Sequence, residues 1–205
     1  GFWARYYPGL RGLSQREKEV NINFYRETRP DLVSKLEAEV AVAKSLRKAL
    51  VNGPFPGMGE GDADLYKAFC WRFWFLASGN NGQIGIVMPR STISAKGSTE
   101  FRKKLFTSHS SFNITTLVNN RNWVFDEGHA QWTYALIAIN KVFNENTQIE
   151  LSGPYNSLSA FETRKEQDVQ IFSGDEVIGW NDTASLPLLP TEKSFVIFKQ
   201  MRNHP

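Results

Sequence analysis

The sequence predicts an α/β fold in which apolar strands are joined by amphipathic helices. Strand-length apolar runs recur with helical or loop-like segments between them, which is typical of a sheet with crossover connections. Hydrophobic residues make up 41% of the 205 residues, enough for a buried core. The three runs lie at residues 83–88, 113–119 and 132–139.

The first of these runs, Gln-Ile-Gly-Ile-Val-Met at 83–88, is short and apolar, and Pro89 ends it. Such a run is typical of a central parallel strand covered on both faces. A helix is expected after it, at about 97–107, with Phe101 and Leu105 facing inward. Its outward face is expected to carry a basic group: Arg102, Lys103 and Lys104.

Helices are predicted ahead of this sheet. Ser14 and Glu17 form a capping box at the start of a first helix,. Pro30 fits the first turn of a second, which has apolar residues at helical spacing,. Residues 55–62 are rich in glycine and read as a flexible stretch,. A third helix at 64–77 is apolar nearly all round, so we expect it to be buried on more than one side.

The pattern weakens after Asn140. Ser157 and Thr191 are expected to cap a short helix and a final helix, respectively. The remaining predicted elements are a strand at 148–151, a helix at 158–165, an extended piece at 169–172, a connector at 186–190 and a helix at 192–202.

Composition bounds the function. Cys70 is the single cysteine, which excludes an internal disulfide and a cysteine zinc site,. The three histidines lack the spacing of metal ligands, so we expect no bound metal,. We find neither an 18-residue apolar run nor a signal peptide, and therefore expect a cytoplasmic protein without a membrane partner. A net charge of +3 permits an acidic partner such as DNA but does not require one,.

Three segments, in this order, carry a resemblance to a known family. They are Asp64-Leu-Tyr-Lys-Ala-Phe69, Gly82-Gln-Ile-Gly-Ile-Val-Met-Pro-Arg-Ser91, and Val124-Phe-Asp-Glu-Gly-His-Ala-Gln-Trp-Thr-Tyr-Ala-Leu-Ile-Ala138. Together they resemble the adenine-specific (N6) DNA methyltransferase domain of type IIG restriction-modification enzymes. The likeness covers residues 2–139, and weaker signs extend it to Pro205.

The resemblance implies a partial Rossmann-like sheet of an S-adenosylmethionine-dependent methyltransferase, made of the later strands and a terminal hairpin. Residues 1–61 would be a helical insertion and linker. Residues 62–142 would be the C-terminal half of the methyltransferase domain, and 143–205 a linker to a target-recognition region.

The strongest motifs of the family are missing from the chain. Asn52-Gly-Pro-Phe55 is like the catalytic N-P-P-aromatic motif, but Gly53 replaces the first proline and the segment follows a helix. Gly57-Met-Gly-Glu-Gly61 also follows a helix, so we interpret it as a linker and not as the glycine-rich cofactor turn,. The family's order then implies that both motifs precede Gly1. We expect an excised piece with no catalytic residue of its own, inactive alone.

Site residues follow from the resemblance. Phe125 would stack on the extruded adenine, and Phe69 would line the adenine pocket of S-adenosylmethionine. Asp64 and Tyr66 would support the catalytic loop. Two further supporting positions, Pro89 and Ser91, come from their place and not from the resemblance, because they end the predicted strand at its carboxyl edge. The basic cluster beside them could touch DNA phosphates; it consists of Lys96, Arg102, Lys103 and Lys104,. Each residue also has a plain structural interpretation: a hairpin residue, a core phenylalanine, a helix cap or a solvated helix face.

The expected function is therefore part of a site-specific DNA adenine-N6 methyltransferase, with double-stranded DNA and the remainder of the parent polypeptide as partners. Two alternatives stay open: a non-enzymatic DNA-binding or specificity module, and a structural domain of a phage-defence complex. The sequence leaves open the recognition site, adenine N6 against cytosine N4, an attached nuclease, the oligomeric state and the parent's length.

Overall fold

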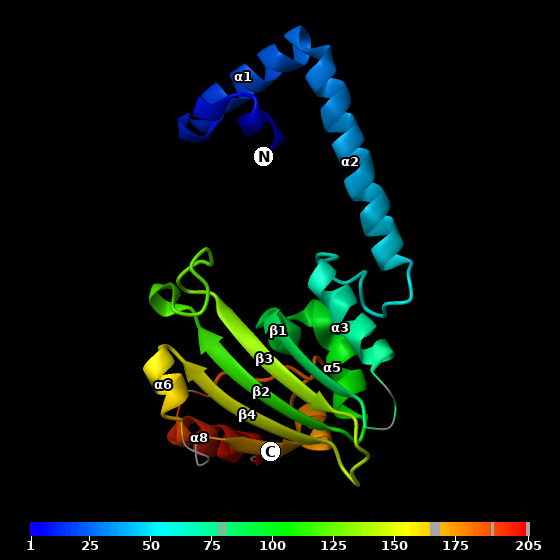
Figure 1. The fold of residues 1–205 in the computed structure, drawn as a ribbon, viewed down its shortest axis with the longest axis vertical. Coiled ribbons are helices and arrows are strands. Elements are labelled where there is room, and N and C mark those ends of the chain that lie inside the picture. The colour runs from blue at the N-terminus through cyan, green and yellow to red at the C-terminus, as the bar shows by residue number, and fades with distance from the viewer. Residues whose placement is uncertain (78, 80, 165–168, 190, 204–205) are drawn as a thin grey trace. The chain divides into compact units, whose positions relative to one another are not determined.

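The computed structural model describes residues 1–77, 79, 81–164, 169–189 and 191–203 (Figure 1). The chain divides into two compact units, Gly1–Gly53 and Pro54–Pro205. We call them the helical unit and the sheet unit and describe each by itself.

The helical unit consists of two short 3-10 helices, η1 (Phe2–Arg5) and η2 (Pro8–Gly12), and two longer helices, α1 (Gln15–Thr28) and α2 (Pro30–Val51). The predicted capping box at Ser14 and Glu17 is confirmed, as is Pro30 in the first turn of α2. Trp3, Leu10 and Leu32 form the small core of this unit.

The sheet unit contains a five-stranded mixed sheet in the order β1-β3-β2-β4-β5. β3 lies antiparallel to both β1 and β2, β4 is parallel to β2, and β5 is antiparallel to β4. A mixed α/β fold is thereby confirmed. The strands are β1 (Gln83–Pro89), β2 (Ser111–Val118), β3 (Thr133–Asn140), β4 (Gln148–Tyr155) and β5 (Gln170–Ser173).

Strand β1 is at the edge of the sheet, so the prediction of a central parallel strand is wrong. Its one neighbour in the described residues is β3, and Val87 is 52% exposed. At the two ends of β1, the N–H of Lys141 donates to the carbonyl of Gly82, and the N–H of Arg90 donates to the carbonyl of Thr133. Antiparallel alternation therefore turns the N–H groups of Gln83, Gly85 and Val87 toward the open edge.

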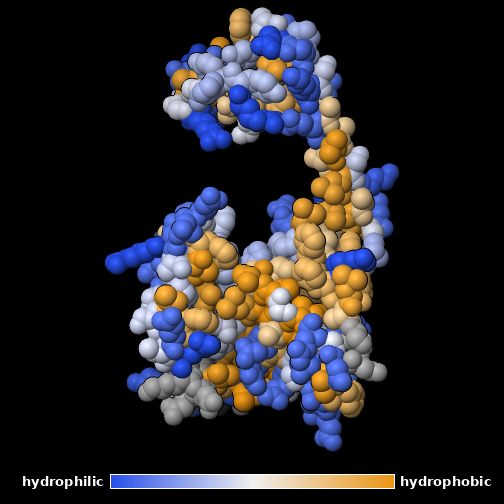
Figure 2. Space-filling model, in the orientation of Figure 1, coloured by the Kyte–Doolittle hydropathy of each residue, from blue (hydrophilic) through white to orange (hydrophobic). Residues whose placement is uncertain are grey.

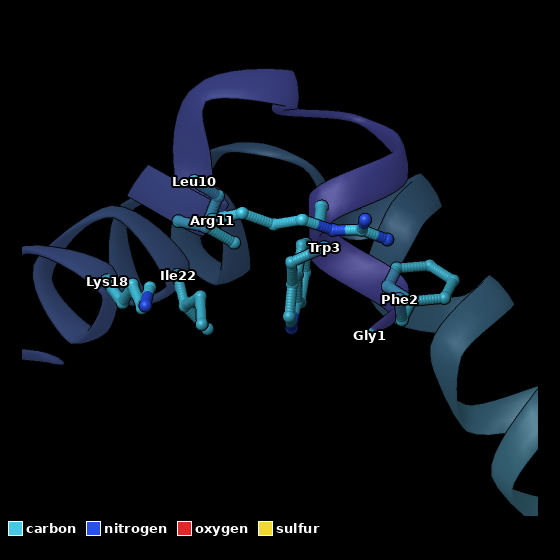
Figure 3. A pocket seen from close by; sticks show the side chains of 8 residues that line it. Gly1, Phe2, Trp3, Leu10, Arg11, Lys18 and Ile22 are labelled. Atoms are coloured by element: carbon cyan, nitrogen blue, oxygen red, sulfur yellow. The ribbon is translucent and has the colours of Figure 1, made fainter. Parts of the chain in front are cut away.

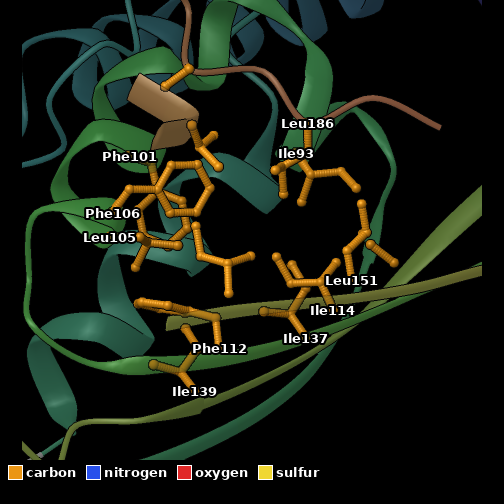
Figure 4. Packing of buried hydrophobic residues seen from close by; sticks show 14 of the residues in the cluster. Ile93, Phe101, Leu105, Phe106, Phe112, Ile114, Ile137, Ile139, Leu151 and Leu186 are labelled. Atoms are coloured by element: carbon orange, nitrogen blue, oxygen red, sulfur yellow. The ribbon is translucent and has the colours of Figure 1, made fainter. Parts of the chain in front are cut away.

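Helices cover one face of the sheet and form the main core with it (Figure 4). Phe101, Leu105 and Phe106 from α5 (Thr99–Phe106) meet Phe112 and other apolar strand residues there. The other helices of this unit are α3 (Leu65–Leu76), α4 (Ser91–Ser94), η3 (Lys96–Ser98), η4 (Asn120–Asn122), α6 (Leu158–Glu162), α7 (Gly174–Trp180) and α8 (Glu192–Asn203).

The opposite face of the sheet is turned toward the viewer in Figure 1, and apolar surface is visible on it in Figure 2. Two shallow hollows lie on this face, lined among others by Gly85, Val87 and Ala138. Apolar strand residues therefore remain in contact with solvent on the side that lacks helical cover.

Two expectations about the start of this unit are corrected. Helix α3 buries Trp71 and Trp74 on one side only, because Phe69, Phe75 and Leu76 on its other side are each more than half exposed. The segment 55–62, expected to be a flexible stretch, is held to the sheet unit at two points: Met58 is buried, and the indole of Trp71 donates to the carbonyl of Pro56 at 3.0 Å.

The later elements confirm the predicted caps. Ser157 accepts from the N–H of Ala160 at the start of α6, and Thr191 accepts from that of Ser194 in α8. The last residue of the predicted helix at 158–165 and Pro190 of the connector lie outside the described residues. Leu186 of the connector is buried, and its N–H bonds to Ile93.

Candidate functional site

The carboxyl end of β1 meets the loop at 119–132, which joins β2 to β3. Pro89, the last residue of β1, pairs with Tyr134 in the register of the sheet. The ring of Phe125 lies edge-on to Tyr134, with 4.8 Å between centroids and 65° between planes. The structure thus brings two predicted site residues, Pro89 and Phe125, to the same tyrosine at one end of the sheet.

Phe125 is presented to solvent by its loop and is not folded into the core. Its exposed fraction is 44%, although its aromatic neighbour Tyr134 is half-buried. A half-exposed aromatic ring that its neighbours hold in place offers a flat apolar surface to a planar ligand. The carboxyl ends of strands in open α/β sheets are also where ligands tend to bind.

Asn119, which the sequence reasoning missed, fixes this loop. It is fully buried, and its side-chain oxygen accepts from the N–H groups of Val124 at 2.9 Å and Phe125 at 3.0 Å. Its amide nitrogen donates to the carbonyl of Phe125 at 2.9 Å and to that of Gly128 at 3.3 Å. One buried side chain therefore satisfies both backbone polar groups of Phe125.

Gly128 is required by the close approach of Tyr134. A Cβ atom added at Gly128 would meet the tyrosine hydroxyl oxygen at 2.6 Å and the Asn119 amide nitrogen at 3.0 Å. Nearby, the indole of Trp123 donates to the carbonyl of Val118 at 2.7 Å. The loop is therefore packed from both sides around Phe125. The sequence feature that could have indicated this fixed loop is Asn119, an asparagine at the position where the strand ends.

Phe69 lies on the solvent side of α3, and none of the described contacts joins it to Phe125. It is 51% exposed, and its ring stacks on Phe73 at 5.9 Å with 22° between planes. Asp64 occupies the position before α3 but makes no side-chain cap bond, so its expected capping role is not seen. Tyr66 is half-buried against the main core. Ser91 begins the four-residue helix α4.

The expected basic surface at α5 is smaller than predicted, because Arg102 is buried. Its guanidinium donates to the carbonyls of Thr92 at 3.1 Å, Ala95 at 2.9 Å and Thr183 at 2.7 Å. Burial lowers the pKa of Arg102 to about 10, so the group stays charged at neutral pH. Bonds to carbonyls from distant segments compensate this buried charge, which is why the residue is not on the outer face of the helix.

The remaining basic candidates are accessible. Lys96 and Lys104 are exposed and Lys103 is half-buried. None of these three lysines forms an ion pair within the described ranges, which leaves their charges available to an anion.

Two ionisable groups of the sheet unit, the buried Cys70 and the half-buried Lys141, are engaged in packing or hydrogen bonding around α3. Burial raises the pKa of the Cys70 thiol to about 12, so it is protonated at neutral pH. The ammonium of Lys141, whose pKa is lowered chiefly by burial, donates to the carbonyls of Trp74 and Ala77 at 3.0 Å each. Both residues support α3 and do not face the Phe125 loop.

In the part of the chain that the structure describes, no group of three or more His, Cys, Asp or Glu side chains gathers in a way that suits a metal ion. Nor is any helix in those ranges long and apolar enough to cross a bilayer.

No protein-family model matches the sequence, and no curated protein matches it either. Two solved structures are similar over 54% of the chain. One is the cryo-EM structure of a DrdV–DNA complex, at 17% identity, a TM-score of 0.40 and 12% coverage of that chain. The other is a modification subunit of a putative type I restriction enzyme from Vibrio vulnificus YJ016, at 16% identity, a TM-score of 0.33 and 26% coverage. This chain thus spans a small part of either one, and these partial likenesses establish no family.

Proposed function

We propose that this chain is part of a DNA adenine-N6 methyltransferase of the type IIG restriction-modification class, and that the Phe125 loop forms one wall of its pocket for an extruded base. The observation that carries the proposal is the buried Asn119, which holds a half-exposed Phe125 against Tyr134 at the carboxyl end of β1. The ordered sequence segments that resemble the family support it.

The energetics of base extrusion suit such a wall. Taking a base out of the stack costs a few kcal/mol, and stacking on an aromatic side chain returns roughly 1–3 kcal/mol. An aromatic ring whose position is fixed before the base arrives keeps more of the stacking energy, because the ring loses less conformational freedom on binding. The five hydrogen bonds between the Asn119 side chain and the loop supply that preorganisation.

The cofactor proposed for the parent enzyme is S-adenosylmethionine, which supplies the methyl group. Phe69, half-exposed and backed by Phe73, is suited to pack on the purine ring of this cofactor. In the proposal, the groups that activate the target amine belong to another part of the parent polypeptide. The chain by itself is then expected to transfer no methyl group.

The test is methyl transfer by the full-length parent enzyme, measured as labelled methyl incorporated into duplex DNA. Phe125→Ala is expected to lower kcat/KM by about 5- to 150-fold, the equivalent of roughly 1–3 kcal/mol of stacking. Phe125→Trp, which keeps an aromatic face, is expected to recover most of it. Phe143→Ala is the matched control, because Phe143 is an exposed loop aromatic beyond the opposite end of β3.

Equal activity of Phe125→Ala and wild type would remove the base-wall role. Methyl transfer by the 205-residue chain alone would contradict the division of the site between two segments. Salt-dependent DNA binding by a parent that neither binds S-adenosylmethionine nor methylates DNA would favour the non-enzymatic DNA-binding module instead.

A further inference from the structure

The positive charge of this chain is concentrated in the helical unit. Residues 1–53 contain ten Lys and Arg and six Asp and Glu, a net charge of +4. The whole chain is +3, so the sheet unit, which holds the Phe125 loop, has a net charge of −1. A polyanion is therefore attracted to the helical unit more than to the proposed base pocket.

The helical unit also contains a cavity of about 310 Å³ between its 3-10 helices and α1 (Figure 3). Its walls combine apolar side chains with two cations, as the close-up shows. The side chains that line it include Phe2, Trp3, Leu10, Ile22, Arg11 and Lys18.

Neither cation has an internal partner in the part of the chain that the structure describes. Arg5 and Arg29 of the same unit are neutralised by Glu39 and Asp31, whereas Arg11 and Lys18 take part in no ion pair or side-chain hydrogen bond within the described ranges. Two unpaired cations beside one cavity favour an anionic occupant.

Trp3 adds a hydrogen-bond donor without an acceptor. It is 8% exposed and lines the cavity, yet its indole N–H makes no hydrogen bond to the described part of the chain. The indoles of Trp71 and Trp123 each donate to a backbone carbonyl, as is usual for a buried tryptophan,. Figure 3 shows the Trp3 nitrogen at the tip of the side chain, away from the η1 backbone.

We propose that this cavity binds the sugar–phosphate backbone of DNA, with a phosphate between Arg11 and Lys18 and a deoxyribose against Phe2 and Ile22. The indole N–H of Trp3 would donate to a phosphate or sugar oxygen. The inference rests on the proposed function only in taking DNA as the ligand. It makes the helical unit a DNA-positioning element separate from the wall at Phe125, and it transfers the main phosphate contacts away from α5.

A polyanion suits the site better than a single acidic group because the charge excess of the helical unit exceeds the two cations at the cavity. Phosphate contacts of this kind position a protein on the duplex without reading sequence. Their contribution falls with salt, since each neutralised phosphate releases condensed counterions.

The experiment measures binding of the full 205-residue chain to a fluorescein-labelled 20-base-pair duplex by anisotropy, at several salt concentrations. Arg11→Gln with Lys18→Gln is expected to weaken binding at least tenfold at low salt. The slope of log K against log salt is expected to become shallower by about 0.9, the value for the one phosphate that the protein no longer neutralises. Trp3→Phe, which keeps the ring and removes the donor, is expected to weaken binding a few-fold.

Two controls remove the same charge elsewhere. Lys44→Gln with Lys48→Gln lies in the helical unit outside the cavity, and Lys103→Gln with Lys104→Gln lies on α5. Both are expected to change the slope by less than half as much as the cavity pair. Circular dichroism of each variant checks that its helix content equals that of the wild type.

Equal losses for the cavity pair and the Lys44–Lys48 pair would overturn the inference, because they would show only the general field of the unit. So would preferential binding of an acidic peptide at the cavity with no DNA binding. Neither result concerns methyl transfer by the parent or its response to Phe125→Ala, so the proposed function is judged separately.

Discussion

The side-chain amide of Asn119 bonds to both backbone polar groups of Phe125, accepting from its N–H at 3.0 Å and donating to its carbonyl at 2.9 Å. The orientation of the proposed base wall therefore depends on one neutral, fully buried residue six positions away.

Replacing Asn119 tests this dependence. Asn119→Ala leaves several buried backbone groups of the loop without a partner, and we expect the free energy of unfolding to fall by about 2–4 kcal/mol. In the parent enzyme, methyl transfer is expected to fall at least as far as in Phe125→Ala. Urea unfolding and methyl incorporation measure the two effects. The control is Asn120→Ala at the exposed neighbouring position. A loss of stability in Asn119→Ala as small as that in Asn120→Ala would contradict the role of Asn119 in fixing the Phe125 loop.

Arg102 is expected to act on stability and not on DNA binding. Arg102→Leu removes the donor for carbonyls at Thr92, Ala95 and Thr183, and we expect unfolding to become easier by about 3–5 kcal/mol,. Lys104→Leu, on the exposed face of the same helix, is expected to change it by less than about 0.5 kcal/mol. A folded Arg102→Leu variant with an altered salt dependence of DNA binding would restore the residue to the phosphate contacts.

Cys70 predicts an alkaline limit to stability. Burial raises the pKa of the Cys70 thiol to about 12, above the ordinary value of 9.0. The contribution of the buried, protonated thiol to the free energy of unfolding is therefore fully present below pH 9,. That contribution is lost as the pH rises from 9 through 12, because the unfolded thiol then ionises more readily than the folded one,. Cys70→Ala should flatten the decline in melting temperature over this interval. Rapid reaction of the native thiol with a disulfide reagent at about pH 8 would be inconsistent with its burial.

Lys141 is expected to hold the end of α3. Its ammonium bonds to the carbonyls of Trp74 and Ala77 and lies 4.1 Å from the centroid of the Trp74 ring. Lys141→Met keeps the aliphatic stem and should cost about 1–2 kcal/mol of stability, measured by urea unfolding. Lys96→Met, at an exposed site without such bonds, should be neutral. The idea fails if the two variants are equally stable.

The sequence was informative where the determinants are local. The capping box at Ser14 and Glu17 and the proline at the start of α2 involve residues within one helical turn, so they were predictable,. The position of Phe125 in a loop ahead of the long strand β3 was predictable for a similar reason, since turn and strand patterns are both short-range.

Long-range contacts were not predictable. Arg102 was expected on the outer face of its helix because charged residues usually are, but its partner Thr183 is 81 positions away,. The edge position of β1 depends on which strands pair, and an apolar run looks the same at an edge or in the centre of a sheet. The cavity at Trp3 arises where two 3-10 helices meet α1, a packing that no sequence period encodes.

Strand β1 also has a consequence for the protein in solution. On its open side a row of amide groups has no strand partner among the described residues, and the exposed apolar side chain of Val87 lies next to it. Such a row is a template on which another extended chain can add itself, including a second molecule of the same kind. The 205-residue polypeptide should therefore cluster as its concentration rises, and light scattering should show that Val87→Lys keeps it dispersed.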